Sequence, residues 1–233
     1  MRVVRFEEFI DEEDNVQWVV EGLLPSVGWT LLVGEKGVGK TTFALQLSKA
    51  LQEGIAFLDR EVVKTKVAYI QADSLTAEWR EIVKGIGVRN SGLTVVDVPM
   101  GCMDNPAYVS WIEKAVSSAQ FLVFDSFYKM TSVSINTERV LIPLTAMKSL
   151  AGNRPWLLLH HPSKSDANDG SGHNSISGDC SNLWVLFKSK LAIKKARLKS
   201  TEDIALAKEG RLWTVIKKKS ESRFDFLGDR LRM

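Results

Sequence analysis

The sequence predicts an α/β fold: a mostly parallel central sheet flanked by helices, with antiparallel strands at the C-terminal end. Two observations lead to this class. Short apolar runs alternate with segments whose apolar residues recur at helical spacing, which is the pattern of parallel strands joined by helical crossovers. A glycine-rich turn separates the first predicted strand from the first predicted helix. The 233 residues fit a short N-terminal segment, residues 1–15, and one domain over residues 16–233.

The predicted elements follow one another in regular order. Apolar runs predict five buried strands, at residues 29–33, 66–70, 93–96, 121–124 and 156–159. Helices are expected at residues 42–53, at 74–85, from 105 onward and at 137–150. The polar, glycine-containing residues 162–178 predict a long loop. Four later runs, at residues 183–187, 191–194, 212–217 and 223–227, are expected to add antiparallel strands to the sheet edge.

Composition excludes several classes of protein. Only two cysteines are present, which argues against a disulfide framework and for a reducing compartment. No apolar run approaches the roughly 18–20 residues that a membrane-spanning helix needs, so we expect a cytoplasmic protein with no membrane partner. The net charge is only +3, but acidic residues crowd the first fifteen positions and residues 188–219 are strongly basic.

Residues 34–41 read GEKGVGKT and match G-x-x-x-x-G-K-[ST], the phosphate-binding P-loop. Its glycines allow a tight turn that aims backbone N–H groups at phosphate oxygens. We expect Lys40 to reach the β- and γ-phosphates of ATP and the Thr41 hydroxyl to ligate Mg²⁺. The helix that follows points the positive end of its dipole at the phosphates. The predicted nucleotide-binding residues are Gly34, Glu35, Lys36, Gly37, Val38, Gly39, Lys40, Thr41 and Thr42.

Two carboxylates follow predicted strands, at the sheet edge where parallel α/β folds bind ligands. Asp125 comes after four apolar residues, the second signature of P-loop proteins, and is expected to hold Mg²⁺ through a water molecule. Asp73 follows the second strand and could polarise the attacking water as a general base. For both residues the alternative is a helix N-cap, since acids are common at that junction.

Histidines and basic residues complete the candidate site. His160 and His161 end the fifth strand, and because strand side chains alternate, only one of them can face a γ-phosphate. Lys195 and Arg197 would point the same way on a strand and could stabilise charge in a transition state, as arginine fingers do. A solvated basic face and a contact with DNA phosphates are the alternatives for this pair.

Taken in order, these motifs resemble a known family. The set comprises WVVEGLLP at residues 18–25, the P-loop, YIQAD at 69–73, FDS at 124–126, HHPSK at 160–164, and SGD at 177–179 followed by Trp184. The sequence over roughly residues 16–200 is similar to the RecA-like ATPase core of the plasmid RepA type, close to the hexameric replicative helicases.

The resemblance assigns roles residue by residue. Lys40 and Thr41 match the nucleotide and Mg²⁺ residues, and Asp125 matches the second Mg²⁺ motif. Asp73 falls where the family usually has a catalytic glutamate, and the shorter side chain predicts slow hydrolysis. His160 or His161 matches the γ-phosphate sensor.

Further roles concern partners. Lys195 and Arg197 resemble the fingers that reach the γ-phosphate of a neighbouring subunit, which implies a homo-oligomer, expected to be a hexamer. The loops after the fourth and fifth strands face the DNA channel in this family. In this sequence they hold Phe127, Tyr128, Lys129 and Lys164, residue types suited to stacking and charge contacts with single-stranded DNA.

The expected function is therefore an ATP-hydrolysing, DNA-dependent motor of the helicase type, acting in replication or repair of a mobile element. Another class remains open because of Asp73: a slow ATP-binding switch, or a recombinase-like assembly factor such as a recombination mediator, without unwinding activity.

Overall fold

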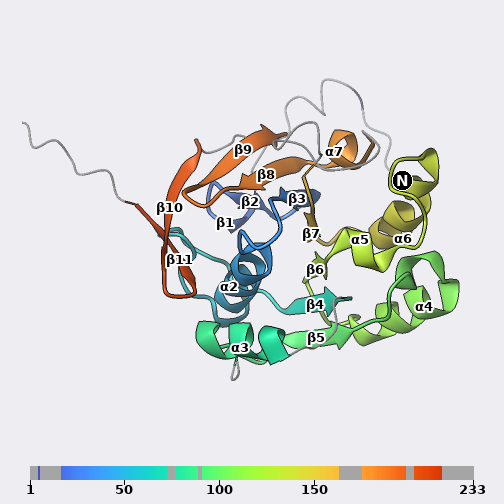
Figure 1. The fold of residues 1–233 in the computed structure, drawn as a ribbon, viewed down its shortest axis with the longest axis horizontal. Coiled ribbons are helices and arrows are strands. Elements are labelled where there is room, and N and C mark those ends of the chain that lie inside the picture. Colours follow the sequence, from blue (N-terminus) through green and yellow to red (C-terminus); the bar gives the residue numbers. More distant parts are fainter. Residues whose placement is uncertain are drawn as a thin grey trace, which may run out of the picture.

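The computed structural model describes residues 5, 17–72, 77–88, 91–162, 175–197 and 202–216. Their central element is a nine-stranded sheet with strand order β11-β10-β9-β8-β3-β7-β6-β4-β5 (Figure 1). A separate two-stranded sheet pairs β1 (Trp18–Val20) with β2 (Leu24–Pro25). No helix among the described residues is both long enough and apolar enough to cross a membrane.

Six neighbouring strands of the large sheet run parallel, and all but the edge strand β5 are buried throughout. They are β3 (Trp29–Val33), β4 (Val67–Gln71), β5 (Thr94–Asp97), β6 (Phe121–Asp125), β7 (Trp156–His160) and β8 (Asn182–Leu186). The five strands predicted from apolar runs are all present. The expectation that the strand near residues 183–187 is antiparallel is wrong, because β8 pairs in parallel with β3.

The antiparallel additions begin with β9 (Lys190–Ala196), which pairs with β8, and continue with β10 (Ile204–Glu209) and β11 (Leu212–Val215). β10 was not expected, since its alanine-rich sequence IALAKE has weak strand character. The strand predicted at residues 223–227 lies outside the described residues.

Helices cover both faces of the sheet. One apolar core joins the sheet to α2 (Lys40–Glu53), α3 (Ala77–Ile86) and the β10–β11 hairpin. The other core lies between the opposite face and α4 (Pro106–Ala115), α5 (Phe127–Met130), α6 (Leu141–Ala151) and α7 (Ser175–Asp179), with the 3-10 turns η1 (Cys102–Asp104) and η2 (Glu138–Val140). In Figure 1, α2 and α5 accordingly lie on opposite sides of the central strands. The result is a three-layer α/β/α arrangement.

Local sequence explains where several helices begin and end. The side chain of Asn105 accepts a hydrogen bond from the N–H of Ala107 and caps α4, whose first residue is Pro106. Gly54 ends α2 in the left-handed conformation, and its N–H donates to the carbonyl of Ala50. Of the predicted loop at residues 162–178, the last part forms the start of α7 instead, and residues 163–174 are outside the described residues.

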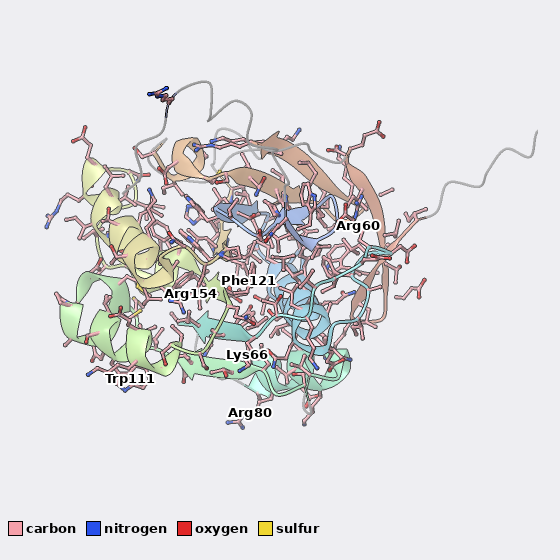
Figure 2. All side chains as sticks on the ribbon, turned by 180° about the vertical axis from the view of Figure 1, so that it is seen from behind. Arg60, Lys66, Arg80, Trp111, Phe121 and Arg154 are labelled. Atoms are coloured by element: carbon pink, nitrogen blue, oxygen red, sulfur yellow. The ribbon has the colours of Figure 1, made fainter. Side chains whose placement is uncertain are left out.

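Arg154 links the C-terminal ends of α4 and α6, the two longer helices on the same face of the sheet. Its guanidinium donates to the carbonyls of Ala151 and Val116, each at 2.9 Å, and to that of Ala119 at 3.3 Å. The guanidinium therefore holds together the segments that follow α4 and α6. Figure 2 labels Arg154 beside α6. Trp111, by contrast, lies on the outer side of α4 and is 54% exposed (Figure 2).

Candidate nucleotide site

The P-loop lies between the end of β3 at Val33 and the start of α2 at Lys40. Gly34 must be a glycine because a Cβ there would come within 2.8 Å of the carbonyl oxygen of Leu186 on β8. The Lys40 ammonium donates to the carbonyls of Gly34 at 2.6 Å and Glu35 at 3.1 Å. These bonds hold the positive charge against the first residues of the loop, where the phosphates of a nucleotide are expected.

A hydroxyl and a carboxylate meet beside the loop. The Thr41 hydroxyl on α2 donates at 2.8 Å to Oδ2 of Asp125, the last residue of β6. In the sheet, β6 and β3 are separated by β7, so the sheet order brings the two residues together although they are 84 positions apart. Both supply hard oxygen ligands of the kind that Mg²⁺ prefers, so the pair fits this cation.

Tyr69 is part of the same cluster. It is fully buried on β4, and its hydroxyl donates at 2.6 Å to the same Oδ2 atom of Asp125. The sequence interpretation did not include this residue. The sequence does contain a sign of this role: a tyrosine lies within the otherwise apolar run VAYI, two positions before the strand end. A hydroxyl buried there needs a polar partner.

The two histidines occupy different environments. His160 is fully buried, and its ring lies edge-on to the ring of Phe127 at a centroid distance of 5.4 Å. Phe127 belongs to the core on the α5 and α6 side of the sheet, whereas α2 and the P-loop lie on the other side. His160 therefore faces away from α2, and His161 follows it as a half-buried residue.

The residues expected to contact DNA differ in their exposure to solvent. The prediction that Phe127 stacks on bases is wrong for this conformation, because its side chain has no exposed surface and packs in the apolar core between the sheet and α6. The neighbouring Tyr128 is 55% exposed, and Lys129 is half-buried. Both lie just beyond the carboxyl end of β6, at the same sheet edge as the P-loop. Lys164 lies outside the described residues.

Lys195 lies near the end of β9 that is far from its own P-loop, and Arg197 follows directly after that strand. β9 runs antiparallel to β8, so Lys195 pairs with Leu183 near the start of β8, and the P-loop lies beyond its end. The Lys195 ammonium donates to the carbonyls of Ser177 at 3.3 Å and Gly178 at 2.7 Å in α7, while Arg197 is exposed. Only Lys195 lies on the strand, since β9 ends at Ala196, and within one chain neither residue joins the P-loop cluster.

Asp73 lies outside the described residues, two positions after the end of β4. The end of that strand is held by the side-chain amide of Gln71, which donates to Asp97 Oδ1 on β5. Asp73 therefore follows a strand end that is fixed at the P-loop edge of the sheet.

The glycine-rich loop, the lysine across it and the threonine–aspartate pair define a RecA-like P-loop nucleoside triphosphatase core. The family model described as the AAA domain matches residues 1–167, and the chain belongs to this family.

The solved structures agree on the fold. The chain is similar to a KaiC-like protein from the hyperthermophilic archaeon Pyrococcus horikoshii, with a TM-score of 0.63 and 17% sequence identity. The match covers 85% of this chain and 94% of that one. It confirms the RecA-like α/β fold, whereas the narrower assignment to the RepA and replicative helicase type stays a prediction. No curated protein matches the sequence.

Proposed function

We propose that the protein is an Mg²⁺-dependent ATP hydrolase. The hydrogen bond between Thr41 and Asp125 carries this proposal, because it joins the two oxygen groups that would hold the cation beside the loop. Lys40 and the N–H groups at the start of α2 would bind the phosphates. Bound Mg²⁺ would neutralise charge on the phosphate oxygens. ATP and Mg²⁺ are thus the cofactors that the residues fit.

Hydrolysis also needs a group that orients the attacking water, and Asp73 is our candidate. A second function follows from its identity. Because aspartate has a shorter side chain than glutamate, its carboxylate would reach less far toward the water, and the protein would act as a slow switch or assembly factor. Replacing Asp73 with glutamate separates the two functions: a large gain in turnover favours the switch.

We propose His161, rather than His160, as the residue that senses the γ-phosphate. The ring of His160 is occupied with Phe127 on the far face of the sheet. Side chains alternate along a strand, so His161, the first residue after β7, would be directed to the face that carries α2.

We further propose that the active form is a homo-oligomer, with a hexamer as the expected size, and that Arg197 completes the site of a neighbouring copy. Support comes from its position: Arg197 is an exposed cation just after the end of β9 that is far from its own P-loop, so it would reach the phosphate of a neighbouring chain. Lys195 is anchored to α7 and is expected to support this strand end.

Mixing two inactive variants tests the shared site. Lys40→Ala removes the phosphate contact but keeps the finger, whereas Arg197→Ala does the reverse. Random mixing should form complete sites at about one quarter of the interfaces, so activity should return to about one quarter of wild type. Mixtures that stay as inactive as their components would overturn the shared site while leaving nucleotide binding untouched.

Single-stranded DNA is the proposed partner, which would make the protein a helicase-like motor. The exposed Tyr128, with Lys129 beside it, offers a stacking ring and a cation at the P-loop edge. Because Phe127 is buried, fewer residues support DNA binding than the sequence predicted.

The primary experiment is steady-state ATP hydrolysis by the full chain with and without single-stranded DNA. Lys40→Ala should reduce turnover to background, and Lys114→Ala, at the exposed end of α4, should not. Strong stimulation by DNA supports the motor. ATP binding with slow turnover that ignores DNA supports the switch, and absence of ATP binding contradicts both.

A further inference from the structure

The β10–β11 hairpin folds back onto α2 and the P-loop. Trp213 on β11 is 1% exposed and packs edge-on against Phe43 of α2, with ring centroids 6.5 Å apart. The side chain of Gln46 on α2 pairs with the Trp213 backbone, donating to its carbonyl at 2.8 Å and accepting from its N–H at 2.9 Å. The hairpin is thus fixed to the first turns of the helix that begins at the P-loop.

Two side chains of this hairpin bind successive carbonyls of the loop. The Lys208 ammonium donates to the carbonyl of Val38 at 2.9 Å, and the Trp213 indole N–H donates to that of Gly39 at 3.4 Å. The ammonium also lies 4.7 Å from the centre of the Trp213 ring, in cation–π contact. Lys208 as a whole residue is exposed, but its charged end contacts both the ring and the loop.

These contacts constrain the N–H groups of the P-loop. A peptide unit is planar and trans, so its C=O and N–H point in opposite directions. A donor that holds the Val38 carbonyl outward therefore directs the N–H of Gly39 to the opposite side of the loop. The bond to the Gly39 carbonyl does the same for the N–H of Lys40. Backbone N–H groups are the means by which such a loop binds phosphate.

Gly39 provides independent evidence that the hairpin approaches closely. Its φ of 110° belongs to the region that favours glycine. A Cβ at this position would come within 2.6 Å of the Lys208 ammonium nitrogen and 3.3 Å of the Trp213 ring. The absent side chain thus leaves the space that the hairpin occupies.

We propose that Lys208 is a positioning residue for nucleotide binding, acting through the Val38 carbonyl, with Trp213 as its support. This inference rests on the proposed nucleotide site. Preordering the loop lowers the cost of binding, so Lys208 should affect ATP and ADP alike, since both carry the α- and β-phosphates. It should affect affinity and KM more than the rate of chemistry.

The test compares dissociation constants for Mg-ATP and Mg-ADP, together with kcat and KM, in wild type and three variants. Lys208→Met keeps the stem over the ring but removes the charged donor. Lys208→Arg restores a charged donor, and Lys190→Met removes an exposed lysine of β9 that forms an ion pair with Asp203 at 3.0 Å. Thermal melting without nucleotide controls for folding.

Lys208→Met should weaken both nucleotides about 3- to 10-fold, the range expected for a hydrogen bond from a partly exposed cation. Lys208→Arg should recover most of this loss, and Lys190→Met should behave as wild type. Unchanged affinities in a folded Lys208→Met variant would overturn the inference. If Lys208→Met melts early, an affinity loss that Lys208→Arg fails to recover would also overturn it. Failure of wild type itself to bind ATP would instead overturn the proposed function.

Discussion

Removing the hydroxyl of Tyr69 should weaken the Mg²⁺ site without touching any predicted ligand. Tyr69→Phe keeps the buried ring on β4 but removes the hydroxyl that donates to Asp125 Oδ2 at 2.6 Å. The Thr41 hydroxyl still donates to the same oxygen. A hydrogen bond to a charged group contributes about 1.5–3 kcal/mol. Because about 1.4 kcal/mol corresponds to a factor of ten, and groups that orient metal ligands are typically worth about 10- to 100-fold, we expect the Mg²⁺ midpoint to rise by about 10- to 100-fold.

The assay is a Mg²⁺ titration of phosphate release at saturating ATP, with Mg²⁺-dependent binding of a fluorescent ATP analogue as a second readout. Tyr108→Phe serves as the control, since Tyr108 is 43% exposed on α4, away from the P-loop. A Tyr69→Phe protein whose midpoint and turnover lie within about twofold of wild type, well below the effect expected for an orienting group, would refute the role assigned to Tyr69.

Two further predictions concern the scaffold. Arg154→Met should lower the free energy of unfolding in urea by about 2–4 kcal/mol, because several main-chain carbonyls lose their charged donor; the exposed Arg139→Met is the control, and an equal effect of both would contradict the argument. Burial raises the pKa of the Cys102 thiol to about 12 from an ordinary 9.0. The unfolded thiol therefore ionises first, and from about pH 9 upward the stability advantage of wild type over Cys102→Ala should fall by about 1.4 kcal/mol per pH unit. If the stability difference between wild type and Cys102→Ala stays constant between pH 8 and 11, Cys102 does not contribute to the pH dependence of stability.

Much of the parallel sheet could be predicted because its strands are continuous apolar runs. The direction of β8 could not, since a buried strand reads the same whether its neighbour runs parallel or antiparallel. β10 escaped prediction because its alanines have weak strand preference, and its place in the sheet depends on pairing with β9 and β11. The first error concerns the direction of pairing, and the second concerns a strand whose local sequence alone does not favour it.

Part of the candidate site could also be predicted from the sequence, and part could not. The meeting of Thr41 and Asp125 was expected, because the motif and the strand-end rule each place one partner at the same sheet edge. The burial of Phe127 depends on how α5 packs against His160, which local sequence does not encode. Lys208 is 170 residues from Val38, and the two meet because the β10–β11 hairpin packs against α2 and the P-loop.

Phosphate release from ATP as a function of Mg²⁺, in wild type and Asp125→Asn, tests the proposed activity most directly. The amide keeps the size of the side chain and removes the charge that the cation needs. We predict saturable, Mg²⁺-dependent turnover for wild type and a loss of about 100-fold or more for the folded variant. Equal turnover at equal Mg²⁺ would contradict the assignment of Asp125 to the cation, and with it the proposed site.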